Sequence, residues 1–271
     1  MMARGRRDLF LQLLSRTSMH EPELASEVFG AIESAAPAWT PGRWDVAEPA
    51  RRPWEPDRID EVWRSLDFTC VSAERGAAEI LVHKRWKRGT THGELWIGAR
   101  SGSVTPDAAV GLFHRLADLL DADYGFLHAF APEDVGQLLG VNEYDGEPRV
   151  HVAPWTLQFH LPGLYWASIF GPSYVDLFGE DAIRTTPSAA IAQLGSKRWY
   201  VQLTPSLLDN QTQRTDVVAA REAAMRHLGV SAFWRPGMSR PIMPRGGRPR
   251  PPGRAPSFDD LRLEAPMAAG R

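Results

Sequence analysis

Hydrophobic and polar positions along the chain follow two patterns, one typical of β-strands and one typical of α-helices. Alternating and continuous apolar runs predict strands over residues 67–72, 78–86, 92–100, 124–130 and 199–203, with a hairpin loop at 87–91. Apolar positions three and four apart predict helices over 21–33, 59–66, 105–120 and 215–228, and residues 8–36 as a whole hold two helical patterns. Strands paired in hairpins and packed with amphipathic helices predict an α+β fold with a largely antiparallel sheet.

Composition divides the chain into three parts. We expect a helical segment over 1–36, an α+β domain over 37–234 and a disordered Pro/Arg-rich tail over 235–271. Residues 37–58 hold many prolines, which predicts an irregular arm held to the body by Trp39, Trp44 and Trp54. The tail is expected to contribute little to stability unless its few apolar residues, Phe258, Leu261 and Leu263, dock on the body.

The chain is organised around residues 161–180. An apolar run from 164 to 170 lies between Pro162-Gly163 and Gly171-Pro172, which predicts a buried strand. Pro172 suits the first turn of a helix that carries Tyr174, and Gly179 suits its end. We interpret this motif as scaffold, with structural roles for Trp166, Phe170, Gly171, Pro172, Tyr174 and Gly179.

The sequence of this motif, LPGLYWASIFGPSYVDLFGEDAI, resembles the signature segment of bacterial type VI immunity proteins and of the similar immunity protein 52 family. The likeness rests on Trp166, Phe170-Gly171-Pro172, Tyr174-Val175 and Phe178-Gly179, whereas Ser168 stands where these families often have Asn. The resemblance implies a protein that binds and neutralises a cognate toxin of a neighbouring bacterium. In immunity protein 52 relatives that toxin is usually inferred to be a nuclease.

Charge is unevenly distributed along the chain. Residues 1–234 hold 23 Lys and Arg against 30 Asp and Glu, whereas residues 235–271 hold eight against three. Between Arg115 and Arg149 there is no Lys or Arg. Acidic side chains without a basic neighbour suit the docking of a basic protein such as a nuclease, although they also serve solubility. The partner-binding candidates are Asp118, Asp121, Asp123, Glu133, Asp134, Glu143, Asp145 and Glu147.

No familiar catalytic or metal-binding motif is present. The eight histidines form no local zinc signature, and the single Cys70 excludes an internal disulfide. Two other functions stay open: an enzyme whose site is assembled from His151, His160, Asp176 and Glu180, and a nucleic-acid accessory protein that uses the basic tail.

No segment has the 18–20 apolar residues of a membrane span. This composition predicts a cytoplasmic protein that does not span a membrane. Together with it, the resemblance implies an immunity protein without cofactor, metal or turnover, whose partner is a bacterial toxin rather than nucleic acid.

Overall fold

The structure is a computed structural model that describes residues 7–17, 19–46, 49–65, 67–74, 76–84, 92–131, 150–234, 255, 256 and 258. Within these residues ten strands form one sheet, in the order β3-β2-β4-β5-β6-β1-β7-β8-β10-β9, and neighbouring strands are antiparallel. The predicted α+β fold with a largely antiparallel sheet is confirmed. The strands are β1 (Leu9–Ser15), β2 (Pro41–Asp45), β3 (Arg52–Pro53), β4 (Asp67–Ser72), β5 (Ala78–His83), β6 (Gly93–Ala99), β7 (Ala122–Ala129), β8 (Ala167–Phe170), β9 (Ala190–Leu194) and β10 (Arg198–Gln202).

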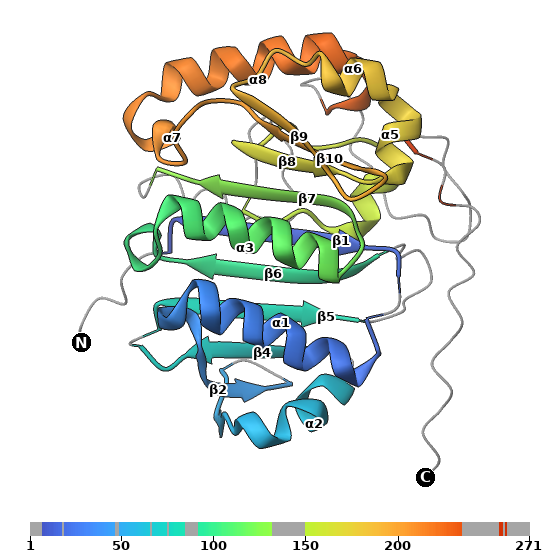
Figure 1. Ribbon diagram of the computed structural model, residues 1–271. Helices are drawn as coiled ribbons and strands as arrows, with labels where there is room; N and C mark the ends of the chain where they lie inside the picture. The colour runs from blue at the N-terminus through green and yellow to red at the C-terminus, as the bar shows by residue number, and fades with distance from the viewer. Residues whose placement is uncertain are drawn as a thin grey trace.

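Helices cover the sheet in two groups (Figure 1). The first group packs on one face over a core that includes Trp63 and Phe113, and the second packs around β8 and β10 over a core on the other face that includes Phe170 and Phe233. The first group is α1 (Pro22–Ala35), α2 (Ile59–Arg64) and α3 (Pro106–Leu119); the second is α5 (Pro172–Phe178), α6 (Glu180–Arg184), α7 (Asp209–Thr212) and α8 (Arg214–Leu228).

The boundaries of the long helices follow their sequence signals. Thr105 caps α3, because its side chain accepts a hydrogen bond from the backbone N–H of Ala108, and Pro106 occupies the first helical position. Gly229 ends α8 with φ 102°, a conformation that costs glycine little.

The N-terminal segment differs from its prediction. Leu9–Ser15 is not helical but forms β1, which lies in the middle of the sheet between β6 and β7. All seven residues of β1 are buried because it is paired on both sides and covered on both faces, so its apolar residues do not alternate. Residues 1–36 and 37–234 therefore contribute strands to the same sheet.

The arm predicted to be irregular over 37–58 contains regular structure. Residues 41–45 form β2, which pairs with β4, and Arg52–Pro53 forms the short terminal strand β3. Three of its prolines lie where a missing N–H is tolerated, at the starts of a 3-10 turn (Pro37), of β2 (Pro41) and of a second 3-10 turn (Pro56). The proline content predicted irregular structure, whereas β2 forms because it pairs with β4, which lies further along the chain.

Most of the predicted disordered tail lies outside the described residues, as do Leu261 and Leu263. Phe258 is described, and it is only 8% exposed. Its ring packs edge-on against the His92 ring at 4.9 Å between centroids, with the Arg16 guanidinium 5.7 Å from the Phe258 centroid. Of the three apolar tail residues named as possible contacts, Phe258 therefore packs on the body.

We expect Phe258→Ala to lower the free energy of unfolding by about 1–3 kcal/mol, because a buried aromatic side chain is lost from one side of a contact. Urea unfolding of the full chain measures this change. Val230→Ala, at an exposed apolar residue, is the control and should change stability little. Equal stabilities of Phe258→Ala and the unsubstituted protein would mean that the tail contact contributes nothing.

Candidate functional site

Two of the predicted docking acids are paired with a distant arginine. Asp118 at the end of α3 and Asp121 in the following turn have side chains 49% and 60% exposed. Both form ion pairs with Arg198 of β10, at 2.7 Å between Arg198 Nη2 and Asp118 Oδ1. The absence of Lys and Arg between 115 and 149 thus does not leave these two acids without a counter-charge. Glu133, Asp134, Glu143, Asp145 and Glu147 lie outside the described residues.

Asp123 is not a surface acid, which corrects its place among the docking candidates. It is 3% exposed, and its carboxylate accepts a hydrogen bond from the Ser173 backbone N–H at 3.1 Å and lies 3.2 Å from His92 Nε2. Burial lowers the pKa of His92, although Asp123 opposes this shift. Asp123 on β7 therefore contacts both Ser173 at the start of α5 and His92, which precedes β6.

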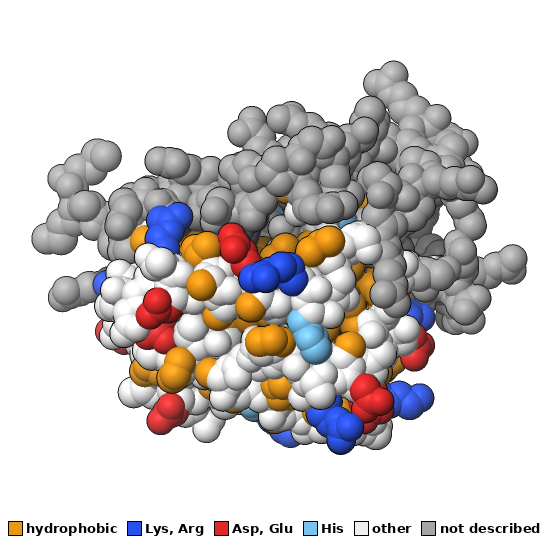
Figure 2. Space-filling model, turned by 90° about the horizontal axis from the view of Figure 1, so that it is seen from above, with side chains coloured by type: hydrophobic (Ala, Val, Ile, Leu, Met, Phe, Trp, Pro, Cys, Tyr) orange, Lys and Arg blue, Asp and Glu red, His pale blue; other side chains and the backbone are white. Residues whose placement is uncertain are grey.

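On the described part of the face seen in Figure 2, no patch consists only of acidic or only of basic side chains. Acidic and basic side chains lie interspersed there with hydrophobic and neutral groups. On this described face, electrostatics alone does not mark a docking surface.

The motif at 161–180 is built into the core as predicted. Trp166 and Phe170 are 1% and 0% exposed, and Tyr174 is 1% exposed. Gly171 passes so close to β7 that a Cβ atom there would lie 2.6 Å from the Asp123 Cα, and its N–H donates to the Asp123 carbonyl at 2.7 Å. Pro172 begins α5, and Gly179 ends it with φ 87°. The strand itself is shorter than predicted, since β8 begins at Ala167.

The four residues of the alternative enzyme site lie in different surroundings. His151 pairs with Glu94, at 2.6 Å between Nε2 and Oε1. His160 is buried, and burial lowers its pKa to about 4. Asp176 on α5 and Glu180 on α6 are exposed, as expected of carboxylates on the flank of a helix.

Sequence reasoning missed the buried carboxylate of Glu94, which lies at the start of β6. Besides His151, it receives a hydrogen bond from Gln12 Nε2 at 2.6 Å and lies 3.5 Å from His83 Nδ1. Burial raises the pKa of Glu94, but the two histidines more than offset this and lower it to about 2. Burial lowers the pKa of His151, and Glu94 more than reverses that effect, so the net shift is upward. A charged residue inside a predicted strand was the available signal.

This cluster fixes the backbone of residues 150–152 on the sheet. Gln12 donates to the Val152 carbonyl at 2.9 Å and accepts from the Val152 N–H at 2.7 Å. The Trp96 indole N–H donates to the Val150 carbonyl at 2.7 Å. With the ion pair of His151, these bonds hold a segment that has no strand partner in the described part of the chain.

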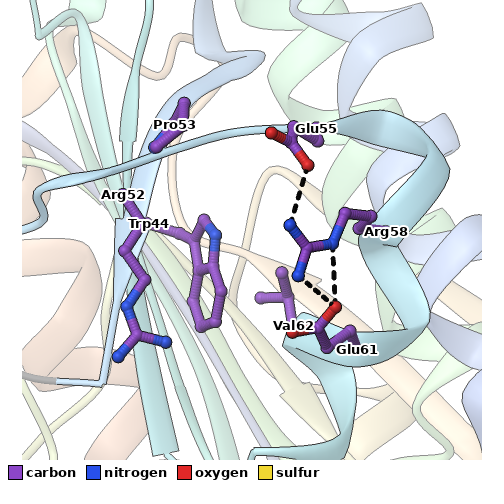
Figure 3. Close-up of a pocket in the computed structure, with 7 residues that line it drawn as sticks. All are labelled: Trp44, Arg52, Pro53, Glu55, Arg58, Glu61 and Val62. Carbon is purple, nitrogen blue, oxygen red and sulfur yellow. Dashed lines mark hydrogen bonds and ion pairs between the residues drawn. The ribbon is translucent and has the colours of Figure 1, made fainter.

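A surface pocket of about 200 Å³ lies at the β3 end of the sheet (Figure 3). Trp44 lines it, and the Arg52 guanidinium lies over the Trp44 ring at 4.9 Å from the centroid. Opposite, Arg58 lies between Glu55 and Glu61, at 3.1 and 2.6 Å. Pro53 and Val62 complete the lining. The pocket therefore combines an aromatic wall with two oriented guanidinium groups.

Of the three tryptophans expected to hold the 37–58 arm to the body, only Trp44 lines this pocket. Trp39 is fully buried, and its indole N–H donates to Ser103 Oγ at 2.8 Å. Trp54 is partly buried and packs on Phe29 with 4.6 Å between ring centroids.

The described residues contain no group of three or more His, Cys, Asp or Glu side chains placed to hold a metal ion. Cys70 is buried, and burial raises the pKa of its thiol. Among the helices in the described ranges, none has the length and apolar character needed to traverse a bilayer.

Comparison with known proteins gives a match in fold. No protein-family model matches the chain, and no curated protein matches its sequence. A solved structure with a similar fold is the Pseudomonas aeruginosa T6SS protein PA0821, with a TM-score of 0.56 and 16% sequence identity. The match covers 86% of this chain and 77% of that one. The chain therefore shares the fold of a protein linked to type VI secretion.

Proposed function

We propose that this protein is an immunity protein that binds a cognate bacterial toxin and blocks it without turnover. The observation that carries the proposal is the fold shared with a T6SS protein over 86% of the chain. The resemblance of residues 161–183 to the signature of type VI immunity proteins points the same way, and it also suggests a nuclease as the toxin. Because Trp166, Phe170 and Tyr174 of that motif are buried, we assign the motif to the scaffold and place the contact with the toxin elsewhere.

The pocket of Figure 3 is the contact surface that we favour within the described residues. Trp and Arg are enriched among the residues that dominate binding energy, and here Arg52 is already stacked on Trp44. A side chain that is held in place before binding loses less conformational entropy when the partner arrives. Arg52 is nevertheless 55% exposed, and its ion pair with Asp45 in the described part of the chain is long at 3.6 Å, so it can still contact a partner.

The acidic residues form the alternative surface. Asp118 and Asp121 are exposed although paired, and the acids from Glu133 to Glu147 lie close together in the sequence. Acids of this kind would speed the approach of a basic toxin more than they would tighten its binding.

Binding of the cognate toxin, to be sought in the adjacent reading frame, distinguishes the two surfaces. We expect Arg52→Glu to raise the Kd at least about ten-fold, which corresponds to the loss of about 1.4 kcal/mol. Arg64→Glu, at an exposed residue of α2 that does not line the pocket, should leave the Kd unchanged. Surface plasmon resonance at low and moderate salt gives both the Kd and the association rate.

If Glu143→Lys with Asp145→Lys slows association in a salt-dependent way while Arg52→Glu binds normally, the acidic surface is the contact. The absence of binding by the unsubstituted protein, together with no protection of cells against the toxin, would overturn the proposed function.

A further inference from the structure

The two ends of the sheet differ in how they are closed. β3 at one end has two residues and contains Pro53, which has no N–H to offer a further strand. β9 at the other end has five residues and pairs on its inner side with β10. No strand in the described part of the chain pairs with the outer side of β9, and Ala190, Ala192 and Gln193 are exposed.

β9 lacks the features that usually protect an exposed edge. Residues 188–196 contain no charged residue and no proline, and residues 190 and 192 have methyl side chains. Natural edge strands are commonly short or carry lysine, proline or a bulge, because unpaired backbone groups attract further strands. An exposed edge that has neither charge nor proline is therefore suited to strand addition.

The strand is also held in place. Ile191 and Leu194 pack partly against the two cores, and Trp199 and Tyr200 of the paired strand β10 are buried. Arg198 at the start of β10 is anchored by Asp118 and Asp121 on the α3–β7 turn. An incoming strand would thus meet a preformed edge and would not have to order it.

We propose that β9 is the site at which a second copy of this chain docks, by antiparallel pairing of the two β9 strands about a two-fold axis. Identical strands related by such an axis are antiparallel, as all neighbours in this sheet already are. With the axis at Ala192, Ile191 lies opposite Gln193 of the second copy, and no like charges oppose each other. A strongly charged partner would find no complement on this strand. The proposal does not depend on the proposed function.

A disulfide test is clean here because the only native cysteine, Cys70, is buried. In the paired dimer, Ala192→Cys places two thiols across the axis within bonding reach, so mild oxidation should give a covalent dimer in high yield. Ser34→Cys, at an exposed position on α1, is the matched control and should cross-link far less. Light scattering should give twice the 30.2 kDa of one chain at high micromolar concentration.

Ala192→Lys brings two ammonium groups together at the axis and should weaken the dimer at least about ten-fold. Its thermal unfolding, monitored by circular dichroism, checks that the chain still folds. A monomer at high concentration with no excess cross-linking of Ala192→Cys over the control would overturn the proposal, as would a dimer that Ala192→Lys leaves unchanged. If the unsubstituted protein is a monomer and Ala192→Lys abolishes its toxin binding, the edge accepts a toxin strand and self-pairing is overturned.

Discussion

Trp166→Ala is expected to lower the free energy of unfolding by about 3–5 kcal/mol and the melting temperature by about 10 °C. Trp166 is 1% exposed, and its indole N–H donates to the Thr204 carbonyl at 3.1 Å. Its backbone N–H donates to His128 Nδ1 at 2.9 Å, and its carbonyl accepts from the Leu203 N–H at 2.8 Å. The substitution leaves these backbone bonds in place but opens a cavity and removes the bond to Thr204.

Differential scanning calorimetry and urea unfolding measure the loss. Trp166→Phe should lose less, because it fills part of the volume while still lacking the indole N–H. Val46→Ala, at a residue 51% exposed, should lose almost nothing. An unchanged melting temperature of Trp166→Ala together with loss of toxin binding would show that the motif is an interface and not scaffold.

Glu94→Gln is expected to cost about 3 kcal/mol, because it removes one partner of a buried ion pair. The carboxylate is 1% exposed and is surrounded by Gln12, His83 and His151. The variant keeps the shape of the side chain, so the loss reports on charge more than on volume. A double-mutant cycle with His151→Gln isolates the coupling between the two residues.

The pH dependence of this difference follows from two opposite shifts. The pKa of Glu94 is lowered from 4.5 to about 2, so its contribution is present above 4.5 and is lost as the pH falls toward 2. The pKa of His151 is raised, so its contribution is present below 6.5 and is lost as the pH rises through the raised value. The difference between the unsubstituted protein and Glu94→Gln should therefore be largest between about pH 4.5 and 6.5.

Taking the stability difference between the unsubstituted protein and Glu94→Gln cancels the pH dependence that other histidines contribute to both proteins. Burial lowers the pKa of His128 to about 3, for example, which destabilises both proteins in acid. A stability difference that stays constant from pH 4 to pH 9 would contradict the assignment of Glu94 and His151 as a charged pair.

The sequence was informative where local signals decide the structure. The cap at Thr105, the glycines at 179 and 229 and the alternation within 78–83 each act over a few residues, and the elements they predict were found. β1 was missed because a fully buried strand and a buried helix share the same continuous apolar pattern. β9 was missed because an edge strand of small, exposed residues has no hydrophobic face to display.

The candidate site was less predictable because it depends on contacts between distant residues. The charge of Asp118 and Asp121 could not be judged without Arg198, which lies about eighty positions further along the chain. Asp123 looked like its neighbours in sequence, but it lies in β7, where every residue is buried whichever face it points to. The sequence named Trp44 only as a tryptophan of the arm and did not predict the pocket. Arg52 reaches Trp44 through the pairing of β2 with β3, and Arg58 lies in the 3-10 turn that precedes α2.

The central position of β1 has a consequence for how the chain folds during synthesis. Leu9 pairs with Ala99 on one side and with Ala129 on the other, so this apolar strand leaves the ribosome long before either partner exists. Contacts so distant in sequence slow folding, and an unpaired apolar strand is prone to aggregate while it waits. β1 can therefore be paired on both sides only after the chain has been made through the end of β7.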